Sequence, residues 1–157
     1  MLETILHPSD FSDTSEFAFK LACSLARDYN ARLILLHVVP PSTAPLLSAP
    51  PANPLIPAEA QEAFIGKFAW PQPPEPNIMV EHRVAEGDAP TEILRLAQTI
   101  NCRRIVMGSQ GRTGLSRLLI GSVAEEVLRK SACPVLVAKK PSSATVLPTS
   151  PAGKPAQ

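Results

Sequence analysis

A cluster of glycines is the part of the chain whose residue types best suit ligand chemistry. Four of the seven glycines lie close together, at Gly108, Gly111, Gly114 and Gly121. The cluster begins after the β-rich run RIVM and ends before the helical pattern SVAEEVL. Parallel sheets bind ligands at the carboxyl ends of their strands, and glycine lets backbone N–H groups approach an anion without a Cβ in the way. The cluster therefore indicates an anion site between a strand and a helix.

The helix after the glycines favours the same site. It begins Ser122-Val-Ala-Glu125, a capping-box spacing that predicts Ser122 as the N-cap. Free N–H groups and the positive end of the helix dipole make such a turn favourable for an anion. The spacing is neither that of a Walker loop nor GxGxxG. Taken alone, the glycines leave two alternatives open, a phosphate cradle and a set of tight turns.

Alternating strand and helix patterns must hold this turn in place. Apolar or β-rich runs predict strands at Thr4–His7, Arg32–Val39, Asn77–Val84, Arg104–Met107 and Pro134–Ala138. Helical spacing predicts one helix from the N-cap Asp13 to about Tyr29, a second opened by Asp88 and Pro90, and a third over Ser122–Ser131. Because the two periods alternate, we expect an α/β fold: a five-stranded parallel doubly wound sheet, Rossmann-like, with strand order 3-2-1-4-5.

The 18 prolines divide the chain into regions of different character. Most of them lie between Pro40 and Pro76 or in the last 17 residues, 141–157. Proline removes a backbone donor and fixes φ, so this density excludes regular sheet and long helix. We expect one domain over residues 1–140 with a proline-rich insert at 40–76. Within the insert Ala58–Phe68 would form a short helix, and 141–157 would be a disordered tail.

Composition limits the class of protein. The 157 residues include 45% apolar and 18% charged residues, enough for the core of one domain. A net charge of +1 argues against nucleic-acid binding through bulk electrostatics, and no apolar run approaches the roughly 18 residues of a membrane span. Cys23, Cys102 and Cys133 are odd in number and widely spaced, which predicts buried reduced thiols. We expect a cytoplasmic protein that binds neither nucleic acid nor membranes.

The glycine spacing and several other segments resemble the universal stress protein family. Gly108, two residues, Gly111, nine residues and Gly121-Ser122 give the G-2x-G-9x-G-S pattern of its ATP-binding type. HPSDFSDTS is similar to the family's first strand and Pro-x-Asp turn, LILLHVV to its second strand, and EGDAPTEIL to the entry of its third helix. RIVMGSQGRTGLSRLLIGSVAEEVLRKSACPVLVAKK matches its most diagnostic block. The likeness covers residues 2–39 and 77–140.

The resemblance implies an ATP site where the first and fourth strands diverge. Asp10 would contact the ribose or adenine side, with Pro8 fixing the turn that presents it. Val38 would give adenine an apolar face, and Met107 and Gly108 would line the ribose and base. The residues implied around the phosphates are Gly111, Gly121, Ser122 and Val123. Each also has a structural interpretation: Asp10 and Ser122 as caps, Val38 and Met107 as core residues.

Two departures from the family pattern limit the chemistry expected. Gln110 stands where many members carry histidine, which puts proton transfer there in doubt. His7 occupies a position that is more often aliphatic. Together with His37 and His82 it forms no ligand spacing, so we expect no metal site of protein ligands. Mg²⁺ would arrive with ATP and be held mainly by phosphate oxygens.

The resemblance, together with the glycine-rich turn, implies a nucleotide (ATP)-binding regulatory protein of the stress response. The apolar strand Pro134–Ala138 would be a sheet edge through which two copies form a homodimer, as family members commonly do. No Ser/His/Asp arrangement, carboxylate pair or nucleophilic cysteine is recognisable, so we assign no catalytic residue and expect at most slow ATP hydrolysis. Two alternatives remain: an AMP or cyclic AMP binder, and a non-nucleotide interaction module acting through the proline-rich insert.

Overall fold

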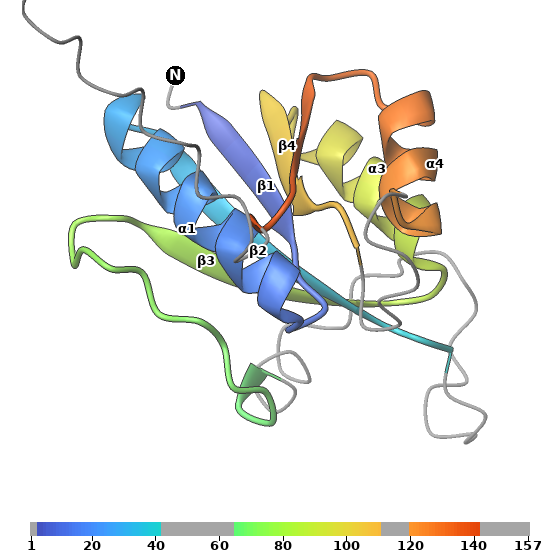
Figure 1. The fold of residues 1–157 in the computed structure, drawn as a ribbon, viewed down its shortest axis with the longest axis horizontal. Helices are drawn as coiled ribbons and strands as arrows, with labels where there is room; N and C mark the ends of the chain where they lie inside the picture. Colours follow the sequence, from blue (N-terminus) through green and yellow to red (C-terminus); the bar gives the residue numbers. More distant parts are fainter. Residues whose placement is uncertain (1–2, 42–64, 111–119, 142–157) are drawn as a thin grey trace, which may run out of the picture.

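A five-stranded parallel sheet forms the centre of the fold (Figure 1). The computed structural model describes residues 3–41, 65–110 and 120–141. Its strands are β1 (Thr4–Pro8), β2 (Arg32–Val39), β3 (Val80–Glu86), β4 (Arg104–Gly108) and β5 (Val135–Ala138). They lie in the order β3-β2-β1-β4-β5, and every pair is parallel. The predicted fold class and strand order are therefore confirmed.

Helices cover both faces of this sheet. The helix α1 (Asp13–Asp28) packs on one face, and α3 (Ala89–Thr99) and α4 (Ser122–Lys130) pack on the other (Figure 1). Alternate strand residues point to the two sides: Ile5 and Leu33 face α1, whereas Leu6 and Ile34 face α3 and α4. All four are fully buried. This two-sided burial explains why β2 is an unbroken apolar run in the sequence.

The amino ends of the helices differ in part from the prediction. α1 is capped by Ser12, whose side chain accepts the N–H of Ser15, and not by Asp13. Asp10 causes the shift, because its Oδ1 accepts both the N–H (3.0 Å) and the Oγ–H (2.6 Å) of Ser12 and so orients that side chain. Asp13 is instead the first helical residue. For α3 the predicted cap Asp88 is found, accepting the N–H of Thr91.

The predicted cap of α4 is wrong in a way that bears on the site. The N-cap is Gly121, and Ser122 is the first helical residue. Among the described residues no side chain forms a capping hydrogen bond at this end. The N–H of Gly121 donates to the carbonyl of Ser109 at 2.7 Å, which holds the helix start beside the end of β4.

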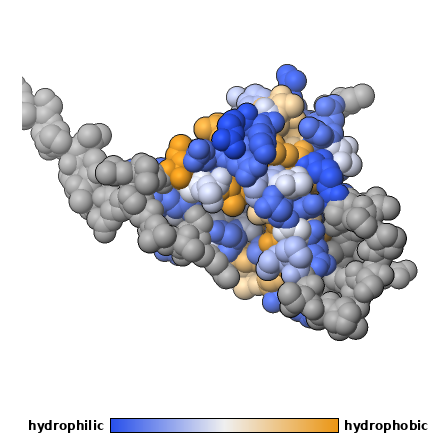
Figure 2. All heavy atoms as spheres, turned by 90° about the vertical axis from the view of Figure 1, so that its right-hand side faces the viewer, coloured by the Kyte–Doolittle hydropathy of each residue, from blue (hydrophilic) through white to orange (hydrophobic). Residues whose placement is uncertain are grey.

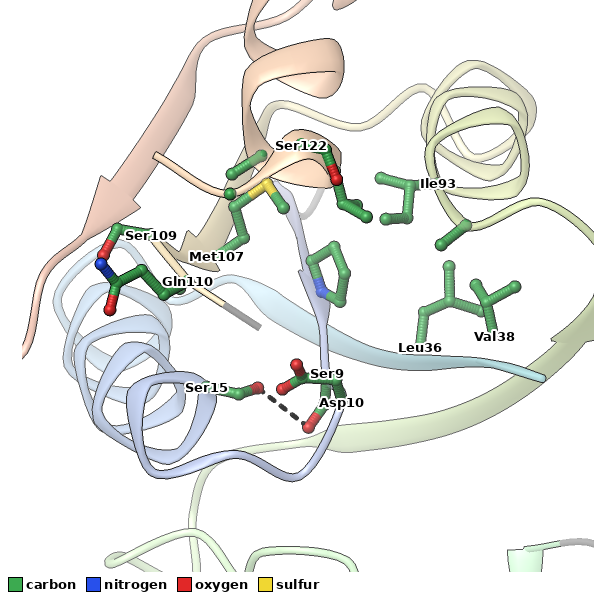
Figure 3. A pocket seen from close by; sticks show the side chains of 16 residues that line it. Ser9, Asp10, Ser15, Leu36, Val38, Ile93, Met107, Ser109, Gln110 and Ser122 are labelled. Atoms are coloured by element: carbon green, nitrogen blue, oxygen red, sulfur yellow. Dashed lines mark hydrogen bonds between the residues drawn. The ribbon is translucent and has the colours of Figure 1, made fainter. Parts of the chain in front are cut away.

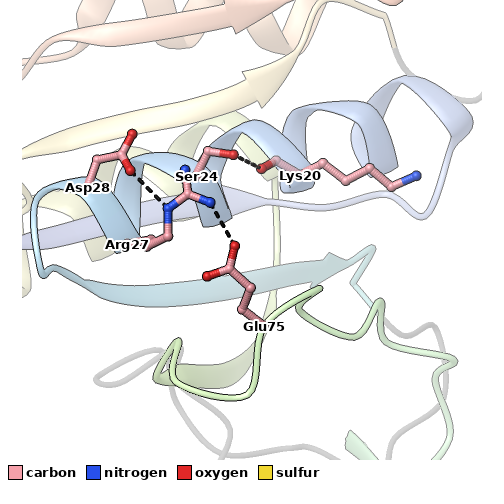
Figure 4. A network of polar contacts seen from close by, with 5 residues as sticks. All are labelled: Lys20, Ser24, Arg27, Asp28 and Glu75. Atoms are coloured by element: carbon pink, nitrogen blue, oxygen red, sulfur yellow. Dashed lines mark hydrogen bonds and ion pairs between the residues drawn. The ribbon is translucent and has the colours of Figure 1, made fainter.

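The segment before β3 packs against α1 instead of pairing in the sheet. Pairing with β2 begins at Val80, later than the predicted Asn77, and extends to Glu86. Ile78 is buried in the core beneath α1 and so contributed to the alternation without being part of the strand. Arg27 of α1 donates to Glu75 at 2.7 Å and also pairs with Asp28 (Figure 4). These exposed ion pairs add little stability, so the buried apolar contacts hold the segment.

Several expectations fall outside the described ranges or are only partly met. Most of the proline-rich insert lies outside the described residues, which resume at residue 65. The predicted helix Ala58–Phe68 is therefore not described up to residue 64, and the tail is not described from residue 142 onward. Cys23 and Cys102 are buried as predicted, but Cys133 is half-buried, and all three are free thiols. None of the described helices has the length and apolar character needed to cross a membrane. The described surface over α3 and α4 is mostly hydrophilic, with hydrophobic residues exposed in separate places (Figure 2).

Candidate functional site

A cavity of about 200 Å³ opens at the carboxyl ends of β1, β2 and β4, against the amino ends of α3 and α4 (Figure 3). This is the topological switch point, where the chain order along the sheet reverses. The predicted site residues that line it are Pro8, Asp10, Val38, Met107, Gly108, Gly121, Ser122 and Val123. The remaining one, Gly111, lies outside the described residues. The structure thus brings together all the predicted residues that it describes.

One end of the cavity is apolar. Leu36 and Val38 of β2 face Ile93 of α3 across it, and Met107 of β4 lies beside them (Figure 3). Such walls suit a flat, weakly polar group such as a heteroaromatic ring. Sequence reasoning missed Leu36 and Ile93. The signal for Leu36 was present, because residues two apart on a strand share a face and Val38 had already been placed in the site.

The other end carries hydroxyl, amide and carboxylate groups from Ser9, Asp10, Ser15, Ser109 and Gln110 (Figure 3). Ser15 Oγ donates to Ser9 Oγ at 3.0 Å, and Ser9 Oγ also accepts the N–H of Phe11. In the described structure the hydrogen bonds of Asp10 use only its Oδ1. The Oδ2 of this carboxylate is therefore available to accept a hydrogen bond from a ligand hydroxyl or amine.

The start of α4 forms the third part of the cavity wall. Because Gly121 has no side chain and no described side chain caps the helix, the first-turn N–H groups are not capped from within the described chain. Ser122 and Val123 line the cavity at this point, and the Ser122 hydroxyl adds one more donor. Together with the helix dipole this arrangement favours an anion.

Gly108 has a packing role that the sequence did not reveal. A Cβ at this position would lie 3.1 Å from the backbone carbon of Thr14 and 3.2 Å from the backbone nitrogen of Ser15. A side chain at residue 108 would therefore require the first turn of α1 to move away from the end of β4 by a few tenths of an ångström. This contact brings the α1 residue Ser15 to the cavity wall.

A buried histidine stabilises the point where β1 and β4 separate. These strands pair at Ile5 and Leu6, but Pro8 has no backbone N–H with which to continue the ladder. The imidazole Nδ1 of His7 donates instead to the carbonyl of Val106 at 2.7 Å. Burial lowers the pKa of His7 to about 4, with smaller opposing effects from this hydrogen bond and from Asp10. The ring is neutral near pH 7, and its Nε2 has no partner among the described residues.

The other two histidines belong to an aromatic cluster near the loop after β1. His37 Nδ1 donates to the carbonyl of Ser9 at 2.8 Å. Its ring lies 4.6 Å from those of Phe11 and Phe68, and the ring of Trp70 lies 4.8 Å from that of His82. Phe11 adopts a left-handed backbone conformation (φ 61°) to join this cluster. The described residues contain no group of histidines, cysteines and carboxylates able to hold a metal ion.

Comparisons with known proteins agree with the fold and with the glycine pattern. Residues 1–139 match the sequence profile of the Universal stress protein family. Universal stress protein MJ0531 of Methanocaldococcus jannaschii is 35% identical over 147 residues, which cover 90% of this chain and 84% of that protein. The solved structure of MJ0577 from the same organism superposes with a TM-score of 0.65 at 29% identity, covering 91% of this chain and 99% of the other.

A third match is a universal stress protein solved in complex with cAMP. It has a TM-score of 0.56 and 26% identity, and the match covers 87% of this chain and 95% of the other. The family profile spans most of the chain, and the curated relative exceeds 30% identity over most of its own length. The resemblance first seen in the glycine spacing is confirmed, and this chain belongs to the universal stress protein family.

Proposed function

We propose that this protein binds an adenine nucleotide, ATP with Mg²⁺, in the cavity at the carboxyl ends of β1, β2 and β4, and that it serves a regulatory role in the stress response. The observation that carries the proposal is that one cavity combines an apolar end, a polar end and a helix start that no described side chain caps. A nucleotide has parts suited to each of the three: a flat base, a hydroxylated sugar and a phosphate chain. The relative solved with cAMP supports the class of ligand.

Each part of the ligand has a proposed place. The base would lie between Val38 and Ile93, with Met107 against its edge or the ribose. The Oδ2 of Asp10 would accept a hydrogen bond from the ribose or the base. The phosphates would lie at Gly121, Ser122 and Val123, with Gly111 of the same glycine pattern completing their surroundings. Mg²⁺ would be held mainly by phosphate oxygens, as it commonly is in nucleotide sites.

The cavity favours binding over catalysis. Asp10 is the one carboxylate among the described lining residues, and Gln110 occupies the place where a proton-transfer histidine would be expected. We therefore propose a nucleotide-dependent regulator with at most slow hydrolysis. AMP or cyclic AMP is the second candidate ligand, and the relative solved with cAMP is the observation that favours it. A binding role of the proline-rich insert is the remaining alternative.

We also propose that two copies pair through β5. This strand is at the edge of the sheet, and the side of β5 away from β4 has no neighbour among the described strands. Leu136, at its centre, is 42% exposed. Exposed backbone groups and an apolar side chain on an edge strand favour pairing with a second chain.

The first experiment is to denature the freshly purified protein and identify any released nucleotide by chromatography and mass. ATP recovered at nearly one per chain supports the main proposal, whereas AMP or cyclic AMP supports the second candidate. A protein that is empty and also fails to bind ATP, AMP and cyclic AMP in calorimetry contradicts both and leaves the insert as the functional element.

A pair of variants at one position tests where the phosphates lie. Ser122→Asp places a negative charge at the start of α4, where it is favourable for the helix but repels phosphate. We expect about a tenfold or greater loss of ATP affinity, which corresponds to about 1.4 kcal/mol. Ser122→Asn has nearly the same shape without the charge and is the matched control. If both variants bind ATP equally well, the phosphates lie elsewhere.

A further inference from the structure

The opposite end of the sheet holds a second cavity, remote from the proposed nucleotide site. It lies where α3 and α4 end and where β4 and β5 begin, and its volume is about 260 Å³. Leu94 and Ala97 of α3 form an apolar wall, and Ser131 borders it from the turn after α4. Two of the three cysteines of the chain, Cys102 and Cys133, line this same cavity. The third, Cys23, is buried in the separate core beneath α1.

The topology of the sheet brings these two cysteines together although they are 31 positions apart in the chain. β4 and β5 are neighbouring parallel strands in which Ile105 pairs with Val135. Cys102 lies just before β4 and Cys133 just before β5, so both are in loops that enter adjacent strands from the same edge. Cys102 belongs to the core under α3 and α4, and Cys133 packs against that core.

The two thiols also influence each other directly. The pKa of the Cys102 thiol is raised to about 12, mainly by burial and then by the charge of Cys133. Because both thiols line one cavity at the start of paired strands, the structure contains a two-cysteine site, and not two isolated cysteines.

The surroundings of the two thiols differ. Cys102 is 8% exposed, and its Sγ donates to the carbonyl of Arg104 at 3.0 Å. Cys133 is half-buried, and its loop is fixed by Ser131, whose Oγ donates to the Cys133 carbonyl at 2.8 Å and accepts its N–H at 3.2 Å. A small oxidant entering the cavity would thus meet Cys133 first, with Cys102 placed behind it.

We propose that Cys102 and Cys133 are a peroxide-sensitive pair that forms a reversible intramolecular disulfide. In the first step the Cys133 sulfur attacks one oxygen of hydrogen peroxide, the O–O bond breaks, and Cys133 sulfenic acid and one water form. In the second step the Cys102 sulfur attacks the sulfenic sulfur and loses its proton, the S–O bond breaks, and a second water leaves. The dithiol is oxidised by two electrons, and the peroxide is reduced to two waters.

The disulfide would close a loop that contains β4, the glycine cluster and α4. It would join the turn after α3 to the turn after α4 and so restrain α4 at the end opposite Ser122. A covalent link of this kind restricts the unfolded chain and raises the unfolding temperature. The proposed disulfide depends only on residues at the second cavity and is independent of nucleotide binding at the first.

The test is to treat the full-length reduced protein with hydrogen peroxide, block remaining thiols with an alkylating agent and digest it for mass spectrometry. We expect disulfide formation to remove the mass of two hydrogen atoms from the chain. A cross-linked Cys102–Cys133 peptide should appear, and Cys23 should be the cysteine that is alkylated. Dithiothreitol should restore three alkylated thiols. The oxidised protein should unfold at a temperature several degrees above that of the reduced protein.

Single serine variants separate this pair from general thiol oxidation. Cys23→Ser should form the disulfide as the parent does and is the matched control. Cys102→Ser should accumulate Cys133 sulfenic acid, which dimedone traps, and should show no rise in unfolding temperature on oxidation. Three freely alkylated thiols after peroxide, over-oxidation of Cys133 in the parent, or a disulfide between two chains would each overturn the proposal.

Discussion

The buried histidine between β1 and β4 should make folding stability depend strongly on pH. His7 is fully buried and has a pKa near 4, whereas the same side chain in the unfolded chain titrates near 6.5. At 1.36 kcal/mol per pH unit this gap is worth roughly 3 kcal/mol. The unfolded state binds the proton more tightly, so the contribution is fully present above pH 6.5. It is lost progressively as the pH falls from 6.5 to about 4, and no more is lost below that.

The measurement is urea unfolding at a series of pH values from 7.5 to 3.5, followed by fluorescence of the single tryptophan, Trp70. His7→Leu removes the titrating group while keeping an apolar side chain in its place. Leaving the Val106 carbonyl without its donor should cost about 1–3 kcal/mol at pH 7. The decisive quantity is the difference between the two proteins, because the carboxylates that they share cancel. The parent should lose roughly 3 kcal/mol relative to the leucine variant between pH 6.5 and 4, so that at pH 4 the variant is at least as stable as the parent.

A second histidine provides the control. The pKa of His82 is also lowered by burial, but its ring is only half-buried, so His82→Gln should retain most of the pH dependence of the parent. If His7→Leu and the parent lose stability in parallel as the pH falls, the neutral His7 ring is not the cause.

Three further predictions concern the site and the surfaces. Asp10→Asn should weaken ATP and AMP binding by the same factor, about tenfold, because Oδ2 is placed at the nucleoside; calorimetry with both ligands checks this, and a loss confined to ATP would contradict that placement. Gly108→Ala should lower the free energy of unfolding by about 1–3 kcal/mol through its clash with Thr14, measured by urea titration; an unchanged midpoint would mean that α1 can move away. Leu136→Glu should convert the proposed dimer to monomer in analytical ultracentrifugation, whereas Met79→Glu, a 57% exposed position near the other sheet edge, should not.

The fold could be predicted from the sequence because local patterns and global topology agree. The apolar run Arg32–Val39 is long enough to identify a doubly covered strand, and its bounds match β2. The errors arise where one residue serves two patterns. Ile78 continues the alternation of β3 but packs under α1 before the strand begins. Asp13 has the spacing of an N-cap, but Ser12 takes that position because Asp10 orients its side chain. A spacing rule that considers the cap residue alone does not show this hydrogen bond from a third residue.

The candidate site was predictable where it depends on residue type and less so where it depends on contacts between distant segments. The glycine spacing and the Pro-x-Asp turn identified residues that line one cavity in the structure. The hydrogen bond from His7 to the Val106 carbonyl joins residues 99 positions apart, and no local sequence pattern predicts it. The packing of Gly108 on Thr14 is of the same kind, because glycine in a ligand loop and glycine at a close contact look alike in sequence.

Pro8 has a consequence for the energetics of ligand capture. Because proline has no backbone N–H to donate, the β1–β4 hydrogen-bond ladder cannot extend past this point. The separation of the two strands is therefore a property of the amino-acid sequence. The cleft therefore exists before any ligand arrives, and binding need not separate paired strands first. A ligand entering a site that is already open retains more of its contact energy as affinity. The rate of association should accordingly not be limited by a separation of β1 from β4.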